Sequence, residues 1–289
     1  MGRLFTIVVA LGFCASMASA EVTASFNVNR DCSLDSHDAG GNVNGGAGSV
    51  EMRGAKASWE EDTSLHDWDI GTINAWIASN GGYGNVTKVE LFIKPLSDQW
   101  STAGPGTVTG RGICVNLMLS GVDWAEGDGM DLWTRYNWSE GRAAATFRFA
   151  QHYYKTEGGV KVDDLDQSVK WQRADGTQVD SLRDLYPDAT ALNSARWTPG
   201  IGAPVDVYYG VELDAGFWEA LLDRGQTSSV RGVILWDHDD AGTNDNWSFS
   251  TRENPSGDAT YLKVTMIPEP ASMALLALGG LAMIRRRRQ

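Results

Sequence analysis

The loop at residues 237–246 concentrates carboxylate oxygens, the ligands that Ca²⁺ prefers. Asp237, Asp239, Asp240 and Asp245 lie close together in the sequence. The best-known calcium loop of proteins ends in a bidentate glutamate, whereas the corresponding residue here is Ser248. Two interpretations therefore stay open: a looser structural calcium site, or a solvated turn in which Asp side chains accept hydrogen bonds from backbone N–H groups.

Tryptophan is the second residue type that could carry chemistry, because a flat sugar ring can stack on an exposed indole. The chain contains 12 tryptophans. Four of them lie in polar or glycine-rich surroundings and are candidates for exposed carbohydrate-binding residues: Trp100, Trp133, Trp138 and Trp171. The alternative is that these side chains fill the core, as most of the 12 are expected to do.

Recognisable catalytic motifs are absent from the sequence. Its 4 histidines share no metal-ligand spacing, and there is no Gly-x-Ser-x-Gly or nucleotide-binding glycine motif. Arg252-Glu253 is interpreted as a structural ion pair rather than a catalytic one. We therefore expect no enzymatic activity and no cofactor other than structural calcium. A polysaccharide lyase or glycoside hydrolase is the alternative, because glycosidase carboxylates are recognised by their separation in space.

Short β-like runs separated by turn residues must position these side chains. Strands are expected at 22–28, 88–93, 112–119, 145–149, 204–211, 232–236 and 260–266. Residues 213–224 predict a helix with Phe217 and Leu221 on its apolar face, and a weaker helix is expected at 73–77. The pattern predicts one all-β domain over residues 21–267, an antiparallel jelly-roll β-sandwich with one or two short helices.

The N-terminal segment has the features of a secretory signal peptide, which we place at residues 1–20. A short positive region at Arg3 precedes an apolar core at 4–13, and Ala18 and Ala20 form a small-residue cleavage site. The sequence therefore predicts export, with the mature chain beginning at Glu21.

Export places the two remaining cysteines, Cys32 and Cys114, in an oxidising compartment. An even pair there predicts a disulfide, and the alternative is two unpaired buried thiols.

The net charge of the predicted domain limits the partners that it can bind. Residues 21–267 carry 19 basic and 36 acidic residues, a net charge of −17, which repels nucleic acid.

The C-terminus combines three features in a fixed order. Pro268, Glu269 and Pro270 precede an apolar run at 271–284, and the cluster of Arg285, Arg286, Arg287 and Arg288 follows. The run is shorter than the about 20 residues that a spanning helix needs, and the arginines would stay on the cytoplasmic side. The simpler alternative is that this C-terminal segment is an ordinary tail anchor.

This order resembles the PEP-CTERM sorting signal of Gram-negative bacteria. The resemblance implies that residues 268–289 are a sorting signal whose short transmembrane helix contacts the inner membrane transiently. It also implies recognition by an exosortase-type membrane protease, and a final location at the cell surface or in the extracellular matrix.

The body of the chain resembles DNRLRE-type domains. The similar segments are 65–73, the Trp-x-Glu element formed by Trp124 and Glu126, and 249–253, whereas Trp68 and Thr251 depart from the usual Phe and Ser. The resemblance implies a jelly roll of the carbohydrate-binding-module kind. The leading hypothesis is a non-catalytic protein of the extracellular polymer layer that binds polysaccharide; a purely structural matrix or adhesion protein is a further alternative.

Overall fold

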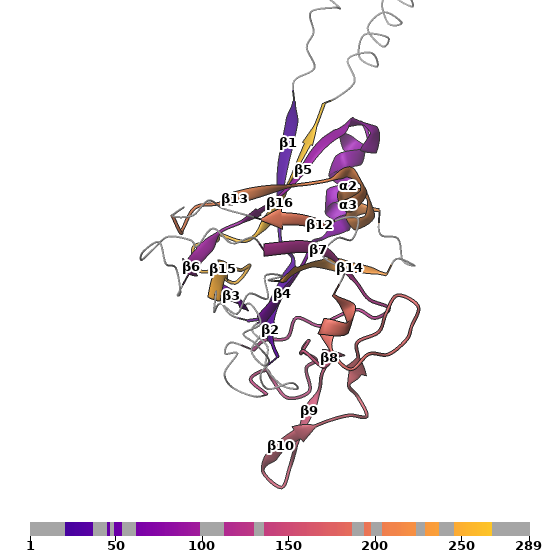
Figure 1. The fold of residues 1–289 in the computed structure, drawn as a ribbon, viewed down its shortest axis with the longest axis vertical. Coiled ribbons are helices and arrows are strands. Elements are labelled where there is room, and N and C mark those ends of the chain that lie inside the picture. Colours follow the sequence, from indigo (N-terminus) through magenta and orange to yellow (C-terminus); the bar gives the residue numbers. More distant parts are fainter. Residues whose placement is uncertain are drawn as a thin grey trace, which may run out of the picture. The chain divides into compact units, whose positions relative to one another are not determined.

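The computed structural model describes residues 21–36, 45–46, 49–53, 62–98, 113–129, 136–186, 194–197, 204–223, 229–236 and 246–267. These residues form mostly antiparallel β-structure with two short helices, which is consistent with the predicted β-sandwich (Figure 1). The jelly-roll connectivity stays a prediction. In this part of the chain no helix is long and apolar enough to cross a membrane. The predicted signal peptide at 1–20 and the apolar run at 271–284 lie outside the described residues.

The chain divides into two compact units. The described residues of the smaller unit are 21–24, 71–88 and 264–267. It holds most of helix α2 (Ile70–Ser79), followed by the 3₁₀ helix η1 (Tyr83–Asn85). Ile73 and Ile77, one turn apart on α2, are buried. The helix ends where Gly82, at positive φ, donates its N–H to the carbonyl of Ile77 at 2.9 Å. A helix centred on 73–77 is thus confirmed.

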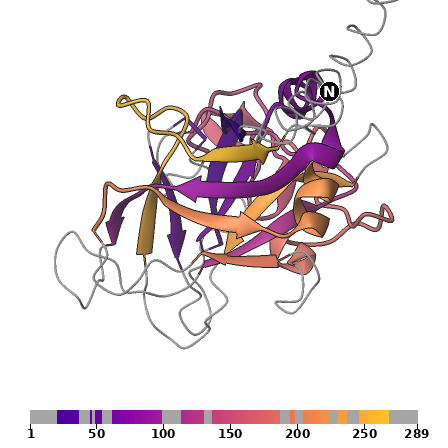
Figure 2. The same ribbon diagram turned by 90° about the horizontal axis from the view of Figure 1, so that it is seen from above.

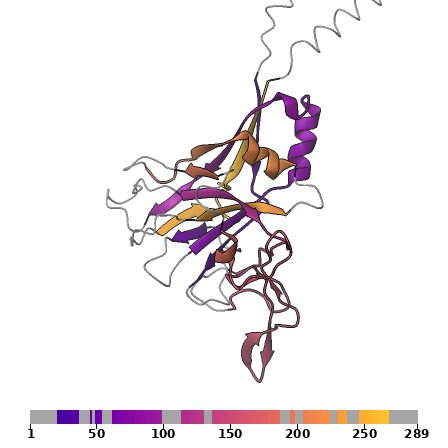
Figure 3. The same cartoon turned by 45° about the vertical axis from the view of Figure 1, so that its right-hand side comes forward.

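The larger unit comprises Ser25–Ile70 and Val89–Lys263. Its main sheet has the order β12-β7-β14-β4-β3-β15-β6, with β2 also paired to β4. The strands are β2 (Arg30–Asp35), β3 (Ser49–Arg53), β4 (Asp62–Asp67), β6 (Pro95–Asp98), β7 (Ile113–Leu119), β12 (Ser194–Trp197), β14 (Val230–Trp236) and β15 (Asn246–Ser250). Strands β4, β14 and β7 lie side by side (Figure 3). The buried strand expected at 232–236 is confirmed as β14.

A second sheet has the order β1-β16-β5-β13. Its strands are β1 (Val22–Asn27), β5 (Val86–Ile93), β13 (Tyr209–Leu213) and β16 (Tyr261–Met266). Strands β5 and β13 run antiparallel beside each other, with Tyr209 opposite Ile93 (Figure 2). On β5 the buried Val89 and Leu91 alternate with half-buried Glu90 and Phe92. One face of β5 therefore covers the core and the other faces solvent.

Helix α3 (Ala215–Leu222) confirms the strongest helical prediction. Asp214 caps its N-terminus, because Asp214 Oδ1 accepts the N–H of Phe217 at 2.7 Å. The helix buries one apolar face made of Phe217, Trp218, Leu221 and Leu222.

Residues 145–149 do not form the predicted strand. Thr146 and Phe149 exchange backbone hydrogen bonds at 2.8 and 3.2 Å, which closes a tight turn, and β8 (Phe149–Gln151) begins only at its end. The chain here forms small antiparallel pairs: β8 with β11 (Val169–Lys170), and β9 (Tyr154–Glu157) with β10 (Val160–Asp163). The 3₁₀ helix η2 (Leu182–Leu185) follows. Alternation alone did not distinguish a turn from a strand here.

The predicted disulfide is wrong, because Cys32 and Cys114 are both buried and neither forms a disulfide. Cys32 lies on β2 and Cys114 on β7, and strands β4 and β14 run between them in the same sheet. Neighbouring strands are about 4.8 Å apart, so three such steps separate the two cysteines. A disulfide needs Cα atoms within about 7 Å. The alternative of two buried thiols is the one that the structure bears out.

His66 is a buried titratable group in the middle of the main sheet. The side chain of this β4 residue is 1% exposed, and its Nε2 lies 2.7 Å from Ser64 Oγ. Burial disfavours the charged imidazolium and lowers the pKa of His66 to about 3.

We expect His66 to weaken the fold in acid. Because its folded pKa lies below the unfolded value of about 6.5, its contribution is complete above that pH and is lost as the pH falls towards 3. Relative to His66→Gln, the wild-type free energy of unfolding should decrease by up to about 1.4 kcal/mol per pH unit in this window. Urea unfolding at pH 7, 6, 5 and 4 measures this difference. A difference that stays constant with pH would contradict it.

Candidate functional site

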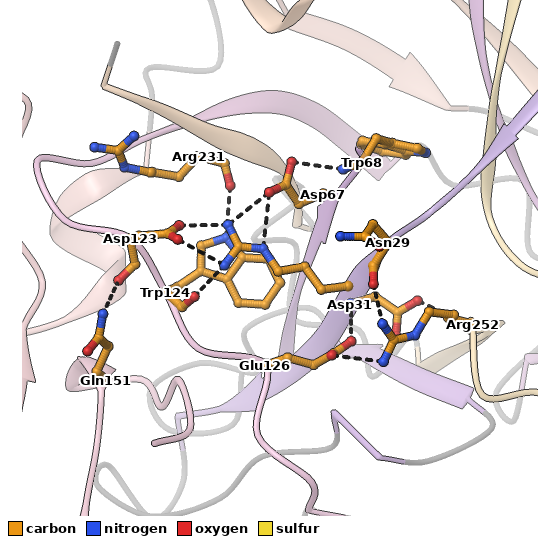
Figure 4. A network of polar contacts seen from close by, with 11 residues as sticks. Asn29, Asp31, Asp67, Trp68, Asp123, Trp124, Glu126, Gln151, Arg231 and Arg252 are labelled. Carbon is orange, nitrogen blue, oxygen red and sulfur yellow. Dashed lines mark hydrogen bonds and ion pairs between the residues drawn. The ribbon is translucent and has the colours of Figure 1, made fainter. Parts of the chain in front are cut away.

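The first part of the candidate site is an arginine network at the start of β2. Arg30 lies opposite Asp67, the last residue of β4, and its Nε and Nη2 donate to Asp67 Oδ2 at 3.0 and 2.8 Å. Arg30 Nη2 and Nη1 also donate to the two carboxylate oxygens of Asp123 at 2.6 and 3.2 Å. The guanidinium further donates to the carbonyl of Trp124 at 2.6 Å and lies 4.3 Å from the centre of its ring. Asp67, Asp123 and Trp124 thus converge on one cation (Figure 4).

Burial and charge act in opposite directions on Arg30. Burial alone would lower the pKa of Arg30, but the hydrogen bonds and charges of Asp123 and Asp67 outweigh it and raise that pKa above its ordinary value. The side chain of Asp67 is only 8% exposed, and its second oxygen accepts the N–H of Trp68 at 2.8 Å. The network therefore holds a nearly buried carboxylate whose ion-pair partner is Arg30.

A glycine in β14 lets Trp124 complete this network. The pairing of β14 with β7 shifts register between Val230 and Val233, where Gly232 has φ +109. A Cβ at Gly232 would lie 2.2 Å from the carbonyl oxygen of His66, so only glycine fits. The preceding carbonyl, that of Arg231, accepts the indole N–H of Trp124 at 2.8 Å. Trp124 is consequently a core residue, as expected.

The second part is a carboxylate cluster around Arg252. Arg252 Nη2 lies 2.9 Å from Glu126 Oε2 and 2.5 Å from Glu253 Oε1, and its Nη1 donates to the carbonyl of Asn29. The backbone N–H of Arg252 donates to Asp31 Oδ2 at 3.0 Å, and that of Asp31 donates to Glu126 Oε1 at 2.7 Å. Figure 4 shows Asp31 and Glu126 beside Arg252. The ion pair predicted for Arg252 and Glu253 is confirmed as one contact of a larger cluster.

Two carboxyl groups of this cluster, Asp31 and Glu126, resist ionisation. Burial, reinforced by the charges of Glu253 and Glu126, raises the pKa of Asp31 to about 8 although the N–H of Arg252 opposes the shift. Burial also raises the pKa of Glu126 to about 7 against the hydrogen bond from Asp31 and the charge of Arg252. Asp31, Glu126 and Glu253 each offer one oxygen, and these oxygens all lie within 4.8 Å of one another. They are the described residues that could hold a metal ion.

A third candidate is a row of aromatic rings on the solvent-facing side of the second sheet. We call Phe92, Tyr261 and Tyr208 the aromatic row; all three are half-buried. The rings of Phe92 and Tyr261 lie 4.8 Å apart and nearly parallel, and Tyr208 meets Tyr261 edge-on at 5.0 Å. Lys263 Nζ lies 6.0 Å from the centre of the Phe92 ring and 3.9 Å from Glu90 Oε2. The polar groups of Lys263 and Glu90 thus lie beside the half-buried rings of the aromatic row.

Two of the four candidate tryptophans are not exposed. Trp138 is 3% exposed and Trp171 is 0% exposed, and both belong to the core cluster that also contains Phe147 and Tyr154. The indole N–H of Trp171 donates to the carbonyl of Thr146 at 2.9 Å. The polar residues beside them in the sequence, Asn137, Ser139, Lys170 and Gln172, are half-buried or exposed, so local polarity misled the prediction. Trp100 and Trp133 lie outside the described residues and remain candidates.

The predicted calcium loop cannot be placed, because Asp237, Asp239, Asp240 and Asp245 lie outside the described residues. Sequence reasoning also missed Arg30 and Asp31. Both belong to a charged run that did not look like a strand, and their signal was their place immediately before the apolar Cys32 and Leu34.

Comparison with known families addresses the C-terminus. Residues 267–288 match the PEP-CTERM protein-sorting motif. The chain carries a PEP-CTERM sorting signal. It is therefore an exported, surface-sorted protein of Gram-negative type, and exosortase, a membrane protein, recognises its motif. No curated protein matches the chain.

Removal of Arg30 should strongly destabilise this surface-sorted protein. Arg30→Ala leaves the 8% exposed Asp67 carboxylate without its cation, and we expect a loss of about 3–5 kcal/mol in the free energy of unfolding. The matched control is Lys170→Ala, which breaks the exposed ion pair with Asp180 and should cost about 0–1 kcal/mol. Chemical unfolding measures both. Equal, small effects would show that the network contributes little.

Proposed function

We propose that the mature domain is a non-catalytic, polysaccharide-binding protein of the extracellular polymer layer, with the jelly-roll topology of DNRLRE-type domains. Its sorting signal supports the location. Support for the topology comes from three distant segments that resemble that family, because Asp67, Trp124 with Glu126, and Arg252 with Glu253 lie within the two arginine-centred clusters. Motifs that belong to one fold are expected to meet in space even when they are distant in the sequence, as these three segments do.

Sorting by exosortase is proposed to remove the C-terminal segment. Cleavage near Pro268–Pro270 would release the domain from the apolar run and the arginine cluster. Mass spectrometry of the protein from the surface of its host should find Glu21 at the N-terminus and no Arg285–Arg288. In a host that lacks exosortase, the arginine cluster should be retained. Surface protein that always keeps the four arginines would contradict cleavage.

The aromatic row is the proposed sugar-binding surface, and it is the observation that carries the binding proposal. Sugar rings pack their C–H faces on aromatic rings, while hydroxyl groups need polar partners at the edge. Phe92 and Tyr261 supply neighbouring rings, and Lys263 and Glu90 supply the polar partners. Gly210 of β13 lies opposite Phe92 of β5, and because it is a glycine it places no side chain over the Phe92 ring.

Truncation of the row should weaken polysaccharide binding. Phe92→Ala and Tyr261→Ala each remove one stacking surface, and we expect a loss of about 1–3 kcal/mol per ring, the range found for ring stacking on aromatic side chains. Tyr83→Ala is the matched control, because Tyr83 is a 37% exposed tyrosine outside the row. Calorimetric titration of the mature protein with the host's extracellular polysaccharide measures this. Equal affinity in all variants would exclude the row and leave Trp100 and Trp133 to be tested.

A polysaccharide lyase is the alternative that one specific observation favours. Tyr136 donates its hydroxyl to Asp163, and His152 Nε2 lies 3.2 Å from the same carboxylate oxygen. Tyrosine, histidine and carboxylate groups can transfer protons in catalysis. However, Tyr136 is 7% exposed and His152 is 0% exposed, so a polymer has no direct access to them. Reducing-end release from the same polysaccharide, abolished in Tyr136→Phe, would establish the enzyme and overturn our proposal.

A further inference from the structure

The carboxylate cluster around Arg252 contains more carboxyl groups than its single guanidinium can pair with. Three carboxylates, those of Asp31, Glu126 and Glu253, face a single guanidinium. When all three are ionised, the cluster has an excess of two negative charges. Burial of such an excess is costly unless another positive group joins it.

Among the residues that the structure describes, none donates a hydrogen bond to two oxygens of the cluster. Asp31 Oδ1 and Glu253 Oε2 are buried and unpartnered, and the whole Asp31 residue is 0% exposed. The other four oxygens accept hydrogen bonds. The backbone N–H of Arg252 donates to Asp31 Oδ2, and that of Asp31 donates to Glu126 Oε1. The Arg252 guanidinium donates to Glu126 Oε2 and Glu253 Oε1. Unsatisfied buried oxygens indicate that a partner joins the cluster.

We propose that Asp31, Glu126 and Glu253 bind one divalent cation, and that this cation is Ca²⁺. Calcium–oxygen distances are about 2.3–2.6 Å, so oxygens up to about 5 Å apart can share one ion. The three oxygens lie within 4.8 Å of one another. Ca²⁺ accepts such irregular, oxygen-only sites and completes its shell with water, whereas Mg²⁺ demands shorter, octahedral contacts.

The site joins three segments of the larger unit that are distant in sequence. Asp31 is the second residue of β2, Glu126 follows β7, and Glu253 follows β15. Gly45 packs directly against the Glu126 segment, since a Cβ there would lie 2.1 Å from the Glu126 carbonyl oxygen. A cation that bridges these segments stabilises the folded state, because the unfolded chain does not bring the three carboxylates together. This site is independent of the proposed sugar-binding surface.

The test is thermal unfolding of the full chain in detergent, treated with EGTA and then titrated with calcium chloride. We expect one Ca²⁺ per chain with a Kd of about 10⁻⁴–10⁻³ M, as in extracellular modules. At about ten times the Kd, Tm should rise by roughly 3–6 °C. Sodium chloride at equal ionic strength should not produce this rise.

Isosteric variants assign the ligands. Asp31→Asn and Glu253→Gln keep the side-chain shape but remove one charge each, and both should lose the calcium-dependent rise. Glu253→Gln carries the test alone if Asp31→Asn does not fold. Asp164→Asn is the matched control, because Asp164 is 8% exposed and lies outside the cluster; it should keep the full rise. A double change of Asp237 and Asp239 to Asn should also keep it.

Three results would overturn the proposal. The wild-type chain could show no calcium-dependent rise in Tm. Asp31→Asn and Glu253→Gln could both keep the rise. The double Asp237 and Asp239 variant could abolish it, which would place calcium in that loop instead.

Discussion

The pairing of the Arg30 guanidinium with the nearly buried Asp67 carboxylate is the interaction on which the centre of the larger unit depends. It joins the start of β2 to the end of β4, and through Asp123 and Trp124 it attaches the segment that follows β7. A buried carboxylate tolerates few alternatives, because a shift of register by one residue would leave it without its cation. The ion pair therefore selects one alignment of these strands among several that apolar residues alone would allow.

The two arginine-centred clusters differ in their charge balance, and this difference separates a structural role from a binding role. Arg30 meets two carboxylates. Its Nε and Nη2 both donate to Asp67, and Nη2 also donates to Asp123, so each of these donors has an acceptor. Arg252 meets three, and no described residue donates a hydrogen bond to one oxygen of Asp31 and one oxygen of Glu253. The first cluster is complete within the chain, whereas the second needs something from outside it. The aromatic row, on the other sheet, is a separate surface with little net charge.

Hydrophobic periodicity correctly predicted those strands and helices in which the apolar residues of the repeat are the buried ones. Strands β5 and β16 and helix α3 show this, because one face of each packs on the core. Prediction failed where tertiary contacts override local pattern. Trp138 and Trp171 have polar neighbours yet lie in the core, and no sequence spacing reveals that β4 and β14 run between Cys32 and Cys114. Motif resemblance found Glu126 and Glu253, whereas Asp31 became visible only through its position beside them.

Because Cys32 and Cys114 form no disulfide in the folded protein, a bond between them would mark chains that have not folded correctly. Cys32 and Cys114 are shielded inside the native sheet, so oxidants reach them only in chains that have not yet folded or that have opened. A bond between them is incompatible with the two intervening strands, and any chain that forms it is trapped outside the native state. In an oxidising compartment, the chain must therefore fold faster than its thiols are oxidised. The yield of mature protein at the surface depends on the ratio of these two rates as well as on equilibrium stability.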